Sequence, residues 1–272
     1  MTKEQKNFIC YGFLIALQLV GVIRLISNGS STAEYDPQEA TARITKYGLA
    51  ERENAVHLMM GVANPDLIKE ATELSDWDGT LMWPVEDGLY VRGWRPKDDT
   101  DHIGIDTSAP AGTSVLAAAD GIVAYAGDAL GGYGNIIFVV HKHGFITSYA
   151  HNTDFVAHMG QLVRKGQEIA HVGATGKADG PHSHWEFKYG GKVCNAGPLV
   201  HEEFLQAGTN APMKDRPQAT WEDPAKRPEG IECVAWRESR KEFGDSIKQA
   251  VGSLMNGARN AVNALRRLWH KR

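Results

Sequence analysis

The chain has 272 residues, of which 42% are apolar and 23% charged, and its formal net charge is −4. This composition is typical of a globular protein and excludes a collagen-like, low-complexity or wholly disordered chain. A net negative charge argues against a general nucleic-acid binder, which normally carries a strong basic excess. At roughly 100–200 residues per domain, the length predicts one substantial domain with appendages, or two small domains.

An apolar run, Phe8–Ile26, follows two lysines at the start of the chain. A helix of this length nearly spans a hydrocarbon core of roughly 30 Å, and Lys3 and Lys6 place the preceding end in the cytoplasm. We expect residues 1–33 to be a single-pass anchor in the inner (cytoplasmic) membrane with a short linker, and the rest of the chain to lie in the periplasm or otherwise outside the cytoplasm. The alternatives are a cleaved signal peptide, although no clear cleavage site follows, and a buried core helix.

Residues 34–79 carry start signals for three short helices. Asp36-Pro37 and Asn64-Pro65 each combine an N-cap side chain with proline at the first helical position. Glycines that can terminate a helix follow the first two segments. The expected helices run from Pro37 to Gly48, from Glu51 to Met60 and from Pro65 to about Leu74. They are predicted to form a stalk, or a cap that restricts access to the next domain.

Residues 80–205 consist of short β-type runs between glycines. The runs are Ser114–Gly127, Asn135–His143, Phe145–His151, Glu168–Gly173 and Ser183–Tyr189. Their spacing, turn residues and β-branched content favour a compact antiparallel β domain, and the lack of an intervening helical period argues against a parallel α/β sheet. The expected fold class is therefore mainly β, with N-terminal helices and a C-terminal amphipathic helix.

Residues 206–272 begin with a proline-rich segment and end with an expected amphipathic helix, Phe243–Trp269. From Lys248 to Arg272 there are six Lys and Arg residues and no acidic one. Such a helix could contact an anionic membrane surface, or it could dock on the protein with its basic face in solvent.

Two cysteines, Cys194 and Cys233, lie outside the apolar run. In an oxidising compartment they could pair, and closing a loop of about 40 residues would contribute roughly 3–4 kcal/mol. The alternative is a pair of free thiols.

A pair of candidate metal ligands, His102 and Asp106, are four residues apart. In a straight strand they would lie about 13 Å apart, too far to share one ion at about 2 Å. The chain must therefore bend between them, and Gly104 is the residue that tolerates a bend.

Three further histidines complete the candidate site. His182 and His184 alternate on one β-type run, so both rings project from the same face, and His151 ends a separate run. Two histidines and one carboxylate with an open fourth position describe a catalytic zinc site. Zinc lowers the pKa of bound water to near 7, and the two remaining histidines are suited to moving the proton.

These residues carry a family resemblance. The motifs are His102-x-Gly-x-Asp106, Tyr149-Ala-His151, and a run from Thr175 to Phe187 that contains Gly-Pro-His182-x-His184-x-Glu186. Together they resemble the lysostaphin-type (LytM-like) zinc metalloendopeptidases over about 100 residues, roughly His102–Leu199.

The resemblance implies an antiparallel β domain with a narrow groove and one zinc ion per chain, held by His102, Asp106 and His184. It further implies that His151 and His182 are catalytic, positioning and deprotonating the attacking water. The implied substrates are the peptides that cross-link bacterial peptidoglycan. Two positions depart from the family pattern, Asn152 and Ser183, but neither is a ligand, and Ser183 is expected to point away from the histidines.

Two other functions compete with this interpretation. A non-catalytic module that binds the cell wall or activates a hydrolase could share the fold, but such a module is expected to lose metal ligands, and here all five residues are present. A non-haem iron oxygenase also uses two histidines and one carboxylate, but it leaves His151 and His182 unexplained.

The remaining polar candidates are expected to be structural. Tyr149 could bind an oxyanion or simply pack in a strand. The histidines without a partner at ligand spacing are His141, His143, His158 and His171.

Overall fold

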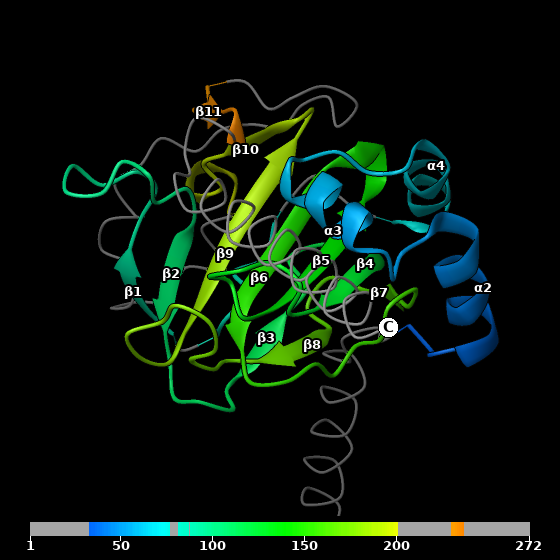
Figure 1. Ribbon diagram of the computed structural model, residues 1–272, viewed down its shortest axis with the longest axis horizontal. Coiled ribbons are helices and arrows are strands. Elements are labelled where there is room, and N and C mark those ends of the chain that lie inside the picture. The colour runs from blue at the N-terminus through cyan, green and yellow to red at the C-terminus, as the bar shows by residue number, and fades with distance from the viewer. Residues whose placement is uncertain (1–32, 77–80, 87, 201–229, 237–272) are drawn as a thin grey trace, which may run out of the picture.

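The computed structural model describes residues 33–76, 81–86, 88–200 and 230–236 (Figure 1). The predictions for the apolar run at 8–26, the proline-rich segment and the amphipathic helix at 243–269 fall outside these residues. Among the helices that the structure describes, none is long and apolar enough to cross a membrane.

Three helices precede the β domain, close to their predicted bounds: α2 (Pro37–Tyr47), α3 (Arg52–Met59) and α4 (Pro65–Leu74). The Asp36 carboxylate accepts a hydrogen bond from the N–H of Gln38 at 2.8 Å, and Gly48 ends α2 with φ at 61°. Because helix ends leave backbone groups without helical partners, caps of this kind define the boundaries.

The β domain contains one large sheet in which every pairing is antiparallel, with the strand order β1-β2-β9-β6-β5-β4-β7. Strand β10 pairs with β9 and with β11, and β3 pairs with β8 in a separate small sheet. The large-sheet strands are β1 (Leu89–Arg92), β2 (Ile105–Ser108), β4 (Gly121–Gly127), β5 (Asn135–His141), β6 (Ile146–Asn152), β7 (Leu162–Val163), β9 (His182–Tyr189), β10 (Lys192–Cys194) and β11 (Cys233–Val234); the small sheet holds β3 (Ser114–Leu116) and β8 (Glu168–His171). The mainly antiparallel β fold is confirmed.

One predicted run, Ser114–Gly127, divides into β3 and β4, which belong to different sheets. The division falls at Asp120-Gly121, where the Asp120 carboxylate accepts from the N–H of Lys165 at 2.8 Å and from Arg164 at 2.9 Å. These contacts hold the chain where it passes from one sheet to the other.

The large sheet has a hydrophobic core on each face. On one face, Trp185 and Phe187 of β9 pack with residues of β3 and β8. On the other face, Phe138 and Val140 of β5 pack against Leu58, Leu67 and other residues of the three helices. Figure 1 shows α2–α4 grouped beside β4 and β5. The helices are therefore part of the folded core. Burial of each large apolar side chain stabilises the fold by roughly 1.5–3 kcal/mol.

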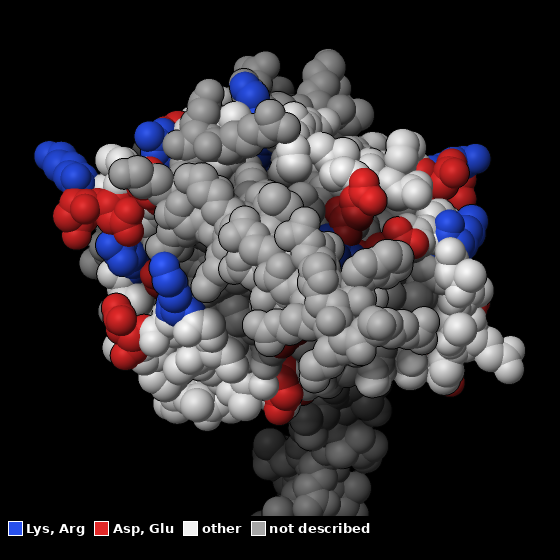
Figure 2. Space-filling model, in the orientation of Figure 1, with Lys and Arg blue, Asp and Glu red and all other residues white. Residues whose placement is uncertain are grey.

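A disulfide joins Cys194 of β10 to Cys233 of β11, which decides between the paired and free alternatives. The residue before Cys233, Glu232, forms an ion pair at 2.7 Å with Arg95, in the loop that precedes β2. On the face drawn in Figure 2, the described Lys and Arg side chains lie among Asp and Glu rather than in a single basic patch.

Candidate metal centre

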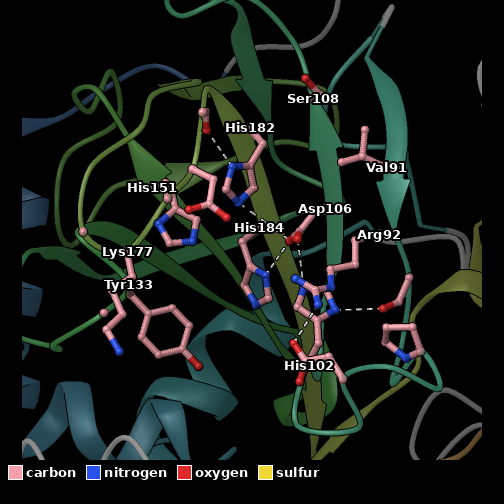
Figure 3. Close-up of a pocket in the computed structure, with 18 of the residues that line it drawn as sticks. Val91, Arg92, His102, Asp106, Ser108, Tyr133, His151, Lys177, His182 and His184 are labelled. Carbon is pink, nitrogen blue, oxygen red and sulfur yellow. Dashed lines mark hydrogen bonds and ion pairs between the residues drawn. The ribbon is translucent and has the colours of Figure 1, made fainter.

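A cavity of about 1320 Å³ opens beside β1, β2 and β9. Its lining includes all five residues singled out from the sequence: His102, Asp106, His151, His182 and His184 (Figure 3). No residue of α2, α3 or α4 is among those lining it. The predicted role of the helices, as a stalk or as a cap that restricts access, stays a prediction.

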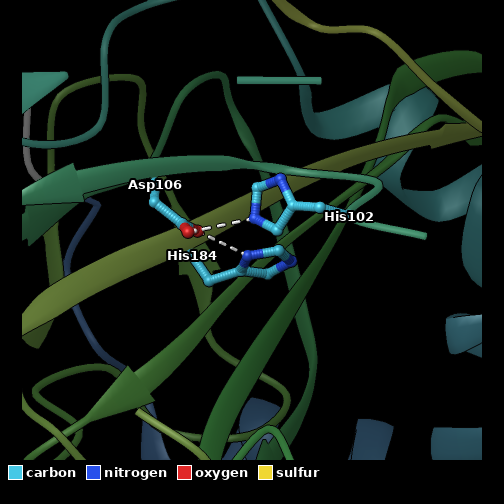
Figure 4. Close-up of side chains that lie close together, drawn as sticks. All are labelled: His102, Asp106 and His184. Carbon is cyan, nitrogen blue, oxygen red and sulfur yellow. Dashed lines mark hydrogen bonds and ion pairs between the residues drawn. The ribbon is translucent and has the colours of Figure 1, made fainter. Parts of the chain in front are cut away.

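Three of these residues offer ligand atoms that all lie within 4.8 Å of one another: His102, Asp106 and His184 (Figure 4). Antiparallel pairing of β2 with β9 sets Asp106 directly opposite His184. The chain bends at Gly104, just before β2, and this bend brings His102 to the same point.

The glycine at position 104 also provides space. A Cβ atom there would lie 2.5 Å from Cε1 of His184 and 2.6 Å from its Nε2. Such distances are far inside van der Waals contact, so any side chain at this position would displace the His184 ring.

The hydrogen bonds of His102 define how its ring presents a lone pair. Its Nδ1–H donates to the Gly93 carbonyl at 2.8 Å, because a carbonyl oxygen can only accept. In the neutral ring, Nε2 then directs a lone pair at Asp106 Oδ2, 3.0 Å away. Two acceptors face each other at this distance, an arrangement that a cation between them stabilises.

The ring of His184 has the opposite orientation. Its Nε2–H donates to Glu186 Oε1 at 2.9 Å, and its Nδ1 lies 2.7 Å from Asp106 Oδ1. Burial disfavours a charge on His184, but the carboxylates of Asp106 and Glu186 outweigh it and raise the pKa of the imidazole. Burial likewise opposes ionisation of Asp106, yet His184 and His102 hold its pKa well below the usual range. The cluster thus offers two ring nitrogens and one carboxylate as ligands for a zinc ion, and the carboxylates of Asp106 and Glu186 supply negative charge that favours a cation.

The other two histidines lie side by side next to this cluster, with ring centroids 4.6 Å apart. His151 donates its Nδ1–H to the Thr175 carbonyl at 2.8 Å, and His182 donates its Nδ1–H to the Gly180 carbonyl at 2.8 Å. In its neutral form, each ring therefore keeps Nε2 as a proton acceptor. That of His182 lies 3.9 Å from Asp106 Oδ1.

The environment of His151 favours the neutral form of its ring. Burial, together with the neighbouring His184, lowers the pKa of its imidazole to about 4, so the ring is neutral near pH 7. Its backbone has φ at 66°, a left-handed conformation that is costly for a residue with a side chain. A hydrogen bond from the His151 N–H to the Tyr133 carbonyl at 2.9 Å helps to hold this conformation.

Sequence reasoning gave no role to three buried residues that extend the site: Tyr133, Glu186 and Lys188. The Tyr133 hydroxyl donates to Glu186 Oε1 at 2.9 Å, and Lys188 donates to Glu186 Oε2 at 2.5 Å. Strand alternation was the signal that could have found two of them, because His182, His184, Glu186 and Lys188 are spaced by two along β9.

The other polar candidates are structural. Tyr149 is fully buried in the core, where its hydroxyl accepts from the N–H of Ala118 at 2.8 Å, so the packing alternative is the right one. None of His141, His143, His158 and His171 lines the cavity.

The comparisons with known proteins agree with this geometry. The model of peptidase family M23 matches residues 100–196, the segment that holds all five residues. Residues 100–196 are an M23 peptidase domain. The resemblance to lysostaphin-type peptidases is thereby confirmed for this part of the chain.

The names of the similar proteins include both a peptidase and an activator of other hydrolases. The chain is 45% identical over 124 residues to the DD-carboxypeptidase/endopeptidase Mpg of Neisseria meningitidis serogroup B, matching 46% of this chain and 26% of Mpg. It is 37% identical over 125 residues to the Murein hydrolase activator NlpD of Escherichia coli, matching 46% of this chain and 31% of NlpD. Over 124 residues it is 36% identical to the Cell division protein DipM of Caulobacter vibrioides, matching 44% of this chain and 20% of DipM. The chain thus spans between a fifth and a third of these relatives.

Solved structures also match. They include a zinc-containing peptidase from Vibrio cholerae, with 30% identity, a TM-score of 0.40, and coverage of 43% of this chain and 39% of that one. Lysostaphin from Staphylococcus simulans matches with 26% identity, a TM-score of 0.41, and coverage of 44% and 52%.

Proposed function

We propose that this chain is a zinc-dependent endopeptidase that cleaves the peptide cross-links of bacterial peptidoglycan. The observation that carries the proposal is the complete site: His102, Asp106 and His184 converge within 4.8 Å, and the rings of His151 and His182 lie beside them. Membership of residues 100–196 in a peptidase family supports the reaction class, and the names of NlpD and Mpg support the cell wall as the substrate.

In this proposal one zinc ion is held by Nε2 of His102, the carboxylate of Asp106 and Nδ1 of His184. These are the atoms that the hydrogen bonds of the two rings leave facing one another. When bound, zinc acts as a Lewis acid that lowers the pKa of water toward 7 and polarises the scissile carbonyl.

The two remaining histidines move the proton. His151 is neutral near pH 7, so its Nε2 can accept the proton of the attacking water. His151 can then give that proton to the leaving amine, while His182, 4.6 Å away between ring centroids, can stabilise the charge that develops on the carbonyl oxygen when its ring is protonated. The backbone carbonyls of Thr175 and Gly180 hold both rings in the required tautomer.

A second candidate function is activation of another cell-wall hydrolase, favoured by the 37% identity to a protein named as such an activator. Binding to a partner does not need an activated water, so an activator has no need of all five residues.

The experiment is digestion of purified peptidoglycan by the chain, with and without a chelator, followed by mass spectrometry of the fragments. We expect new amino and carboxyl ends in the cross-links, loss of cleavage with chelator, and recovery with added zinc. No release of fragments by the zinc-loaded chain alone, together with faster release when the chain is added to another cell-wall hydrolase, would support activation instead.

We also propose that the apolar run at 8–26 anchors the chain in the inner membrane, with the M23 domain outside the cytoplasm where peptidoglycan lies. If the full-length chain is expressed and the protein is recovered in the soluble fraction with a new N-terminus near Ala33, the anchor is contradicted.

A further inference from the structure

A buried charged pair lies next to the candidate metal site, and no step of the proposed reaction uses it. Lys188 is fully buried on β9, and its Nζ donates to Glu186 Oε2 at 2.5 Å and to Ser148 Oγ at 2.7 Å. Removing two charges from water is costly, and replacing such a pair by apolar residues is often neutral for folding. Stability alone is therefore a poor reason for its presence.

Glu186 connects this lysine to the site. Its Oε2 accepts from Lys188, while its Oε1 accepts from the Tyr133 hydroxyl at 2.9 Å and from His184 Nε2–H at 2.9 Å. With partners on both oxygens, the carboxylate cannot rotate without breaking at least one hydrogen bond. The acceptor that faces His184 is thus fixed in place.

His184 needs such an acceptor more than the other three histidines do. His102, His151 and His182 each donate Nδ1–H to a backbone carbonyl, whose position the fold itself determines. His184 alone among these four donates Nε2–H to a side chain. A side-chain acceptor must itself be held, and Lys188 is placed to do this.

We propose that Lys188 and Glu186 are positioning residues that fix the ring and the tautomer of His184, so that its Nδ1 faces the metal site beside Asp106. The inference rests on the proposed metal site. Partners of a metal-bound histidine typically change metal affinity by about 10–100-fold when they are removed. The same range is expected here, although Lys188 is not among the residues that line the cavity.

The test measures zinc affinity by competition with a chromophoric chelator. Lys188→Met keeps the length of the side chain and removes the cation, and the double variant Glu186→Leu/Lys188→Met removes the whole buried pair. Both should bind zinc about 10–100-fold more weakly than the wild type. In the cobalt-loaded forms, the visible spectrum should change as well, because it reports the ligand geometry independently of activity.

Thr147, the residue before Ser148, provides a matched control. Thr147→Val removes a buried hydroxyl from β6, where Thr147 bonds to Tyr149 and His141 in the core behind the sheet. It should lower the stability of the chelator-treated chain and leave zinc affinity within about twofold.

The outcomes separate the inference from the proposed function. If the wild type binds no zinc, the proposed function fails. If the wild type binds zinc tightly and both variants bind it equally well, the function stands and the positioning role is wrong. Equal loss of affinity in Thr147→Val would also overturn it, because the loss would then follow general destabilisation. Should Lys188→Met fail to fold, the double variant, which leaves no buried charge unpaired, makes the same comparison.

Discussion

Single histidines in this chain differ in role because their hydrogen bonds and burial differ. His184 is a ligand in the proposed site, whereas His182 and His151 handle protons. His184→Ala should therefore purify with little zinc, since two ligands hold the ion poorly. His182→Ala and His151→Ala should keep zinc near one per chain and lose about 10²–10⁴ in rate, the usual scale for general acid–base catalysis. Elemental analysis beside a peptidoglycan digestion rate is the measurement. Loss of zinc from His182→Ala and its retention by His184→Ala would reverse the assignment.

A second prediction concerns His141, which is fully buried behind the sheet and bonded to the Asp120 carbonyl at 2.8 Å. Burial lowers the pKa of its imidazole to about 4, against an ordinary value of 6.5. The unfolded chain therefore binds a proton that the folded chain does not, and stability falls as pH falls from about 6.5 to 4. Between pH 7 and pH 5 the loss should be about 2 kcal/mol.

The check is urea unfolding at both pH values in chelator, for the wild type and for His141→Gln. Between the two pH values, the free energy of unfolding of the variant should change by about 2 kcal/mol less than that of the wild type. His151, whose pKa is shifted in the same direction, contributes equally to the wild type and the variant. An unchanged pH dependence in the variant would contradict the assignment to His141.

At this scale the five site residues could be predicted because their spacing and motifs were visible in the sequence. Tyr133 could not, because it lies in the loop before β5 and reaches the site only through the fold. Strand alternation places Lys188 on the same face as His184, but its contact with Ser148 depends on the pairing of β6 with β9. For Gly104, the bend was predicted, but the closeness of the His184 ring was not.

Among the elements, the three helices give a prediction that tests whether they restrict access to the site. Leu67 of α4 is fully buried in the core that the helices share with β4 and β5. Leu67→Ala should lower the free energy of unfolding by about 2–4 kcal/mol and leave zinc content and digestion rate unchanged well below the melting temperature. Faster digestion by this variant would indicate that the helices do restrict access.

The helix boundaries were predictable because caps are local signals: Asp36 and Asn64 each accept from the first backbone N–H groups of the helix that follows. The division of β3 from β4 was not, because it depends on distant contacts of Asp120. The packing of the helices on the sheet was not predictable either, because an apolar helix face does not indicate which element of the fold it packs against.

A further prediction at this scale concerns strand β11. The disulfide holds β11 to β10, and Glu232 beside it pairs with Arg95. The Arg95 N–H in turn donates to the His102 carbonyl at 2.8 Å. Cys233→Ser should therefore lower the free energy of unfolding by roughly 2–4 kcal/mol and speed zinc release by loosening the loop that carries His102.

Glu232→Gln is the control for that variant, because it keeps the disulfide and removes only a partly exposed ion pair, worth about 1 kcal/mol or less. Thermal unfolding and the rate of zinc transfer to a chelator measure both effects. If Cys233→Ser is as stable as the wild type and releases zinc at the same rate, β11 does not support the site.

For the whole molecule, the sequence predicted a mainly antiparallel β domain after a set of helices, and the described residues form that arrangement. They also bring together two histidines and an aspartate that could hold a metal ion. The proposed anchor at 8–26 and the basic helix at 243–269 lie outside those residues and stay predictions. Peptidase and activator relatives cover similar shares of the chain, so similarity alone does not decide between the two functions.

The most direct measurement uses one purified cross-linked muropeptide dimer and no other enzyme. The zinc-loaded chain should convert the dimer to monomers, and chelator should stop the conversion. Asp106→Asn, which keeps the shape of the side chain but removes its charge, should be slower by at least about 10², because it weakens the ligand set on which the proposed reaction depends. An uncut dimer in the presence of a chain that carries one zinc ion would contradict the account.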